Sequence, residues 1–287
     1  MAAVVSRETY GLPRAVAPDV EVLAVGDLHG RADLLQALLD EAAIEPKRRE
    51  RRILLFLGDL VDRGPDSLGA INLAIGAGAR IRADETVALI GNHEAMMRLA
   101  LDAQTPREAA LDALGAWLRN GGTAVVRQIA DLDPPPAAPE ALLAVLRVAL
   151  PDWVRRWLET LRPHWRTGGV LFVHAGVNPG IDIETFLAAP WNEPLARLKE
   201  ERHWAWVRWP FLEASLGADG FSGYFVVHGH TPNDALPRPS HADQIRRFRL
   251  NLDAGSGLTG LAKMAVIRGN EAKVLTALGP TNRMLKA

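Results

Sequence analysis

Cysteine is absent from the 287 residues of this chain, and that absence excludes several kinds of chemistry. Without a thiol there is no disulfide framework, no thiolate metal site and no cysteine nucleophile. A run of 18 uncharged apolar residues is also missing, so no transmembrane helix is expected. The N-terminal segment carries Arg7 and Glu8 without a continuous apolar stretch, which does not match a secretory signal. We therefore expect a soluble, cytoplasmic protein with no membrane partner.

An excess of charge of either sign is lacking as well. The chain has 33 basic and 34 acidic residues and a formal net charge of −1. Proteins that bind nucleic acid usually carry a basic excess, so we expect no nucleic-acid partner. Apolar residues make up 48% and charged residues 23% of the chain, which are the proportions of a globular protein with a sizeable core.

Three short apolar runs near the N-terminus each end at a glycine followed by a polar residue. Since they are apolar on both faces, they predict buried strands of a parallel or mixed sheet. Two segments with helical spacing lie between them, which predicts the order β-α-β-α-β. Ligands of such sheets bind at the carboxyl ends of the strands. The strands are predicted at Val20–Val25, Ile53–Leu57 and Thr86–Ile90, and the helices at Ala32–Ala43 and Asp66–Ala77.

The middle of the chain has a different pattern. Helical segments around Glu108–Leu118 and Glu140–Leu150 predict a helical insertion over about residues 94–162, within a single domain that spans residues 1–287. Strand character returns at Val170–Val173. A second group of strands is predicted at Phe225–Val227, Arg247–Leu252 and Met264–Ile267.

Five clusters of potential ligand residues fall at the ends of predicted strands. A single Gly-Asp after a strand is usually only a turn, and a lone histidine there is more often a structural residue. However, five of the eight histidines lie in these clusters. Carboxylate, carboxamide and imidazole ligands together suit Mn, Fe or Zn, and the lack of thiolates argues against a closed structural zinc site. The clusters are Gly26-Asp27-Leu28-His29-Gly30, Gly58-Asp59-Leu60-Val61-Asp62-Arg63-Gly64, Gly91-Asn92-His93-Glu94, Val173-His174-Ala175-Gly176 and His228-Gly229-His230-Thr231.

In type and order, these clusters resemble the motifs of the calcineurin-type metallophosphoesterases. Within that family the chain is most similar to the compact bacterial and phage form of the PPP-type serine/threonine protein phosphatases. The resemblance runs from Asp27 to about Ile267. It implies an α/β fold, a metallophosphoesterase sandwich of two mixed β-sheets flanked by helices, with the helical insertion added to it.

The same resemblance implies a centre of two divalent metal ions. By analogy with the family, Asp27 and His29 bind the first metal, Asp59 bridges both metals, and the second metal is completed by Asn92, His174 and His230. A hydroxide activated by two metals would attack phosphorus directly. Manganese is expected from the resemblance to bacterial members, although these ligands would also accept iron or zinc.

The resemblance also assigns residues to catalysis. His93 is the implied general acid, and Asp62 would orient it and favour its charged form. The alternative for Asp62 is a loop salt bridge with Arg63. The phosphate oxygens would be held by Arg63, Asn92 and Arg208, although Arg208 lies among tryptophans and would otherwise be a surface residue.

The final cluster resembles the PPP type because a single histidine, His230, follows Gly229, and Pro232 stands where other families have a second ligand. His228 is then expected to be structural.

The expected function is metal-dependent hydrolysis of phosphate monoesters, with phosphoserine or phosphothreonine in proteins as the favoured substrate. A small phosphoester is the other expected partner. The closest alternative is a symmetrical dinucleoside tetraphosphate (Ap4A) hydrolase, whose members commonly lack the aspartate that Asp62 represents. A further alternative is a catalytically silent scaffold that binds phosphorylated partners.

Overall fold

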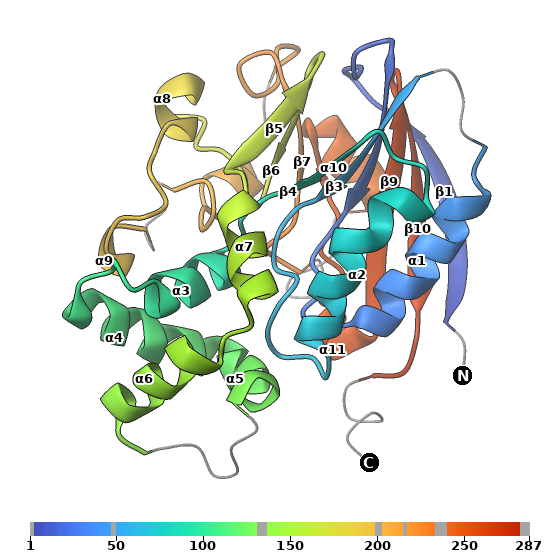
Figure 1. The fold of residues 1–287 in the computed structure, drawn as a ribbon. Helices are drawn as coiled ribbons and strands as arrows, with labels where there is room; N and C mark the ends of the chain where they lie inside the picture. Colours follow the sequence, from blue (N-terminus) through green and yellow to red (C-terminus); the bar gives the residue numbers. More distant parts are fainter. Residues whose placement is uncertain are drawn as a thin grey trace.

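The computed structural model describes residues 3–46, 50–130, 137–198, 203–214, 217–232 and 240–281. Its strands form two sheets, shown in Figure 1. The strands are β1 (Val4–Gly11), β2 (Val20–Val25), β3 (Arg51–Phe56), β4 (Glu85–Ala88), β5 (His164–Thr167), β6 (Val170–Val173), β7 (Phe225–His228), β8 (Arg249–Asn251), β9 (Leu261–Arg268) and β10 (Glu271–Leu278).

Both sheets are mixed. The first has the order β1-β10-β9-β2-β3-β4, in which β2, β3 and β4 run parallel and the other pairs are antiparallel. The second has the order β5-β6-β7-β8, with β6, β7 and β8 parallel. The expected α/β sandwich of two mixed sheets is therefore confirmed.

Alternation along the strands explains why the two sheets pack together. In β2, Val22 and Ala24 belong to the core between the sheets, whereas Leu23 and Val25 belong to the core on the helix side. Successive side chains of a strand point to opposite faces, so a strand that is apolar throughout is buried on both. Phe172 and Phe225 enter the same inter-sheet core from the second sheet.

The helices cover the sheets and build a separate group. Figure 1 shows α1 and α2 across one face of the six-stranded sheet, and α3 to α7 gathered to one side of it. The helices are α1 (Ala32–Ile44), α2 (Ser67–Arg80), α3 (Asn92–Leu101), α4 (Arg107–Trp117), α5 (Thr123–Ala130), α6 (Pro139–Ala149), α7 (Asp152–Thr160), α8 (Ile183–Leu187), α9 (Leu195–Leu198), α10 (His241–Arg246) and α11 (Ser256–Thr259), with a π-helical turn η1 (Leu118–Gly122) and a 3-10 turn η2 (Phe211–Glu213).

Most predicted elements are present within one to three residues of their expected ends. The prediction for Met264–Ile267 was wrong in one respect, because these residues lie in β9, which pairs with β2 in the first sheet rather than with the second group. Strands β1, β5 and β10 were not predicted. Residues 94–130 and 137–162 are predominantly helical, as the insertion predicts. Among the described residues, no helix is both long and apolar enough to cross a membrane.

Candidate metal centre and catalytic site

The candidate ligands gather where strands of both sheets end. The first sheet contributes Asp27 after β2, Asp59 after β3, and Asn92 at the start of α3. The second contributes His174, directly after β6, and His230, two residues beyond β7. The parallel strands β2, β3 and β4 of the first sheet, and β6 and β7 of the second, bring these residues to one edge of the sandwich.

Backbone conformation sets these residues apart from the rest of the described chain. Eight non-glycine residues have a positive φ there, and five of them are candidate site residues. Left-handed backbone costs energy for residues with a side chain, and such conformations cluster at functional sites. The five are His29 (46°), Asp59 (53°), Asp62 (75°), Arg63 (64°) and His230 (69°).

Asp59 occupies the middle of the cluster. Its carboxylate lies 3.7 Å from His29 Nε2 and 3.4 Å from His174 Nε2. Two groups of potential ligand atoms, each within 4.8 Å, share Asp59: one also contains His29 and His93, and the other His174 and His230. A carboxylate common to two ligand groups is the arrangement that a bridging residue between two metal ions requires.

Buried polar atoms without a protein partner also fit a metal centre. Asp27 Oδ1 and His230 Nε2 lack any hydrogen-bond partner in the described structure, although both side chains are at least 94% buried. Buried polar groups are normally satisfied, and metal coordination would satisfy these two. A Cβ on Gly229 would lie 1.9 Å from Asp27 Oδ1, so only glycine allows this close approach. The donor set therefore fits divalent ions.

Backbone carbonyls orient two of the imidazoles. His29 Nδ1 donates to Val61 O and His174 Nδ1 donates to Leu57 O, both at 2.9 Å. Since a carbonyl only accepts, each ring keeps its proton on Nδ1 and turns the Nε2 lone pair to the centre. Burial lowers the pKa of His29 and of His230 well below the usual range. Neutral imidazole is the form that binds a metal.

Asn92 holds the two histidines of the second group. Its Oδ1 accepts from His230 Nδ1 at 2.8 Å, and His174 Nε2 lies 3.1 Å from the same oxygen. Asn92 is 7% exposed, so its amide reaches both the centre and the adjoining cavity.

Glu94 was quoted in the sequence cluster without a role, and the structure shows what it contacts. Its carboxylate accepts from the backbone N–H groups of Asp59 and Leu60, both at 2.8 Å, and of Gly91 at 3.1 Å. Burial raises the pKa of Glu94 to about 7. Glu94 therefore ties the loop after β3 to the start of α3. A glutamate three residues into a helix is the signal that would have indicated this role.

Asp253 is a second residue that the sequence clusters missed. It follows β8, is 1% exposed, and its Oδ2 has no hydrogen-bond partner in the described structure. Burial raises the pKa of Asp253 to about 6. Burial raises the pKa of Asp27 well above its usual range, and the negative charge of Asp253 adds to this effect. A single Asp-Ala-Gly after a short strand gave no signal distinguishing it from a turn.

His93 and Asp62 are in direct contact. His93 Nδ1 lies 2.5 Å from Asp62 Oδ2, and both side chains are buried. No ion pair links Asp62 with Arg63 in the described structure, where Asp62 is held instead by His93 and Trp117. That Asp62 favours the charged form of His93 stays a prediction. Burial lowers the pKa of His93 to about 4, against the opposing effect of Asp59.

Two arginines face the same cavity. It has a volume of about 260 Å³ and is lined by Asp59, Arg63, Asn92, His93 and Arg208, among others. The Arg63 guanidinium lies 2.6 Å from His29 Nε2 and 2.9 Å from His93 Nε2. Arg208 is exposed, and its Nε donates to Thr231 Oγ1 at 3.2 Å. The structure thus brings all ten predicted site residues to one centre and its cavity.

His228 lies apart from the ligand atoms. It is fully buried, its Nδ1 donates to Gly229 O at 3.0 Å, and its ring meets Phe211 edge-on. Burial lowers its pKa to about 3, which keeps the ring neutral. These contacts agree with a structural residue.

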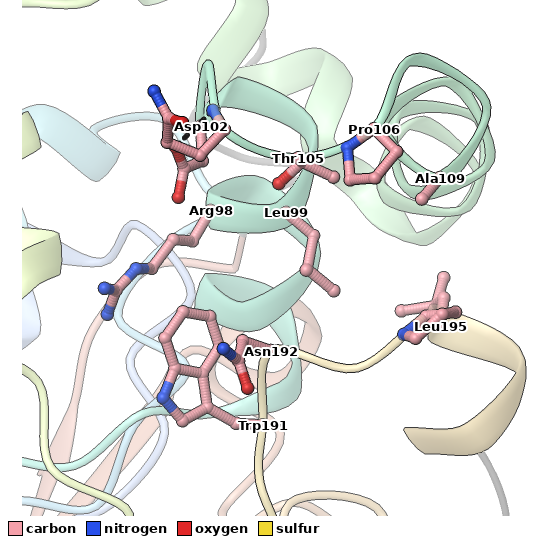
Figure 2. Close-up of a pocket in the computed structure, with 11 residues that line it drawn as sticks. Arg98, Leu99, Asp102, Thr105, Pro106, Ala109, Trp191, Asn192 and Leu195 are labelled. Carbon is pink, nitrogen blue, oxygen red and sulfur yellow. Dashed lines mark hydrogen bonds between the residues drawn. The ribbon is translucent and has the colours of Figure 1, made fainter.

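A second cavity, of about 290 Å³, lies between the end of α3, the start of α4 and residues 191–195 (Figure 2). Arg98 covers the ring of Trp191 at 3.9 Å and donates to Leu158 O at 3.0 Å. None of the candidate site residues lines this cavity.

Comparison with known proteins places these features in a family. The model of the calcineurin-like phosphoesterases matches residues 20–259. A serine/threonine-protein phosphatase 1 of Salmonella typhimurium is 38% identical over 110 residues, which is 38% of this chain and 43% of the relative. A symmetrical bis(5'-nucleosyl)-tetraphosphatase of Acidovorax sp. strain JS42 is 29% identical over 223 residues, which is 77% of this chain and 61% of the relative.

This chain thus spans less than two thirds of the length of either relative. The crystal structure of a cold-active protein-tyrosine phosphatase from a psychrophilic Shewanella species is similar in fold, with a TM-score of 0.51 and 18% identity. The likeness covers 88% of this chain and 79% of that one.

Proposed function

This chain belongs to the calcineurin-like phosphoesterase family, and from that premise we propose that it hydrolyses phosphate monoesters at a centre of two divalent metal ions. The observation that carries the proposal is the shared position of Asp59 between two groups of buried ligand atoms. We propose Asp27 and His29 for the first ion, and Asn92, His174 and His230 for the second, with manganese as the expected metal.

When bound, the two ions would polarise the phosphate and supply an activated water as nucleophile. The residues of the chain perform the other tasks. Arg63 and Arg208 would hold the phosphate oxygens, together with the Asn92 amide. Arg63 must turn away from His29 and His93 to do so, since its guanidinium now contacts both Nε2 atoms.

His93 would protonate the leaving oxygen through Nε2. Asp62 contacts the opposite ring nitrogen, so it fixes the direction of Nε2 and can stabilise the charged ring. A phosphate bound beside His93 would bring negative charge, which would raise the pKa of His93 and favour its protonated form.

Two classes of substrate are considered for this site. The Asp62–His93 contact supports a phosphatase acting on phosphoserine or phosphothreonine, because the dinucleotide hydrolases commonly lack the equivalent aspartate. The greater coverage by the tetraphosphatase relative supports the Ap4A alternative. We favour the protein phosphatase, because Asp62 acts at the reacting centre itself.

The first experiment measures hydrolysis of p-nitrophenyl phosphate by metal-stripped chain, with and without added Mn²⁺. Strong metal-dependent turnover is expected. A folded chain that shows no turnover with Mn²⁺, Fe²⁺ or Zn²⁺ would contradict the proposal and favour the silent scaffold.

The second experiment compares phosphoserine and phosphothreonine peptides with diadenosine tetraphosphate at equal concentration. Turnover of the peptides is expected to dominate. Exclusive turnover of the dinucleotide would overturn the preferred substrate while leaving the metal-dependent mechanism in place.

A further inference from the structure

One part of the helical insertion that reaches the catalytic centre is Trp117 with the turn η1 that follows it. Trp117 is the last residue of α4 and is fully buried. The turn is a kink between α4 and α5, in which the backbone of Gly121 is not helical.

Trp117 contacts the same Asp62 carboxylate as His93 does. Its indole Nε1–H donates to both carboxylate oxygens, at 2.8 Å to Oδ1 and 3.0 Å to Oδ2. Oδ2 also receives His93 Nδ1 at 2.5 Å. The Asp62 side chain is 0% exposed, so water is not available to replace a lost donor. These two rings fix the carboxylate in the described structure.

The turn η1 holds the neighbouring residue, Arg63. The backbone N–H of Arg63 donates to Gly121 O at 3.1 Å, and its Nε donates to Asn120 O at 3.3 Å. Gly121 has a φ of 107°, and a Cβ at that position would lie 2.6 Å from Arg63 Cγ. One segment of the insertion thus supports two adjacent residues that act at the centre.

We propose that Trp117 is a positioning residue, which orients the Asp62 carboxylate and through it directs His93 Nε2 to the leaving oxygen. The inference rests on the proposed phosphoesterase function. An indole N–H can only donate, so it requires Asp62 to present acceptors. A buried carboxylate that loses one of its two donors is free to rotate or to take a proton, and the His93 ring then loses its support.

Burial alone would also explain a tryptophan at this position. Trp117 packs within the main hydrophobic core, and a Cβ on Gly122 would lie 2.7 Å from the indole. A purely structural role predicts lower stability after substitution, but no selective effect on proton transfer. The test must therefore separate loss of packing from loss of the N–H donor.

The variant Trp117→Phe keeps an aromatic ring and removes the donor. Hydrolysis is measured for phenyl phosphate, whose leaving group needs a proton, and for p-nitrophenyl phosphate, whose leaving group does not. We expect kcat to fall roughly 10-fold or more on phenyl phosphate and by less than about threefold on p-nitrophenyl phosphate, with KM and bound metal little changed. Trp157→Phe, in α7 of the same insertion, controls for packing and should leave both values unchanged.

Asp62→Asn should show the same dependence on leaving group, and adding Trp117→Phe to it should cause little further loss, because the two residues act as one unit. Equal losses on both substrates, or additive losses in the double variant, would overturn the role of Trp117. If Asp62→Asn itself shows no dependence on leaving group, the proposed proton transfer is wrong, and the inference fails with it.

A spectroscopic measurement is independent of turnover. The His93 Nδ1–H proton of the metal-free chain is recorded by ¹H–¹⁵N NMR, and its signal should move upfield in Trp117→Phe as the contact with Asp62 weakens. An unchanged signal would contradict the inference even in a chain that shows no activity.

Discussion

At the residue scale, Asp59 and His93 are adjacent in space, but their substitution should have different effects on activity and metal binding. Asp59→Asn removes a shared charge and should abolish activity together with most metal binding. His93→Asn should lower kcat by about 10²–10⁴-fold and keep the metal, because it removes only proton transfer. Activity and bound metal, the latter by elemental analysis, are measured on the same samples. Full activity in a metal-loaded His93→Asn chain would refute the role of His93.

Arg208 is the least constrained of the predicted phosphate-binding residues, since its side chain is held in the described structure by a hydrogen bond to Thr231 alone. Arg208→Ala should lower kcat/KM roughly 10-fold or more, because hydrogen bonds to a charged group contribute about 1.5–3 kcal/mol. The exposed Arg166, which pairs with Glu184 outside the cavity, provides the matched control Arg166→Ala. Equal values for both variants would show that Arg208 does not contact the substrate.

The buried His203 should make the stability of the folded chain depend on pH. Its side chain is 3% exposed, Nδ1 accepts from Ala205 N–H at 3.1 Å, and burial lowers its pKa to about 4. The unfolded chain binds a proton near pH 6.5 while the folded chain does not. Stability should therefore fall as the pH drops from about 6.5 to 4, by on the order of 1–3 kcal/mol in total.

His203→Asn retains an acceptor for Ala205 and removes the titrating group. Urea unfolding of the two chains at a series of pH values measures the difference. Parallel pH profiles would contradict the assignment of this loss to His203.

At the element scale, three strands of the first sheet share a buried ion cluster. Glu21 on β2 lies between Arg52 on β3, with 2.5 Å between Oε2 and Nε, and Arg268 on β9. Glu21→Met leaves the fully buried Arg52 without its carboxylate, and should destabilise the chain by about 3–5 kcal/mol. Urea unfolding measures this loss.

The double variant Glu21→Met/Arg52→Met removes both charges and should recover much of that stability. Metal binding should be unchanged in either variant, because Asp27 lies six residues beyond Glu21, at the far end of the strand. A Glu21→Met chain as stable as the wild type would show that the cluster contributes nothing to the sheet.

At the scale of the whole molecule, the centre joins the two sheets. Asp27 and Asp59 come from the first sheet, and His174 and His230 from the second. Metal that binds only the folded chain should raise Tm by roughly 5 °C at 100 times its Kd, an effect that Asp59→Asn should largely remove. If residues 1–287 form one domain, calorimetry should record one cooperative transition. Two transitions, or a Tm independent of metal, would contradict these expectations.

The sequence by itself determined the parts of this protein that depend on local order. Runs that are largely apolar on both faces predicted β2, β3 and β6, because such strands are buried on both sides. The five clusters predicted the ligand types and their place at strand ends, because a turn after a strand concentrates glycine and polar residues. Strands β1 and β10 were not predicted, because their alternating or exposed residues resemble those of loops.

Only the tertiary structure decided how distant segments meet. Strand β9 pairs with β2 across more than two hundred residues, and nothing local indicates which sheet a short apolar strand joins. Asp253 and Trp117 reach the centre from β8 and from the helical insertion, and their own sequence neighbourhoods carry no sign of it. The charge of His93 was also a tertiary outcome. The contact with Asp62 could be predicted from sequence, but the burial that lowers the pKa of His93 comes from packing of the whole molecule.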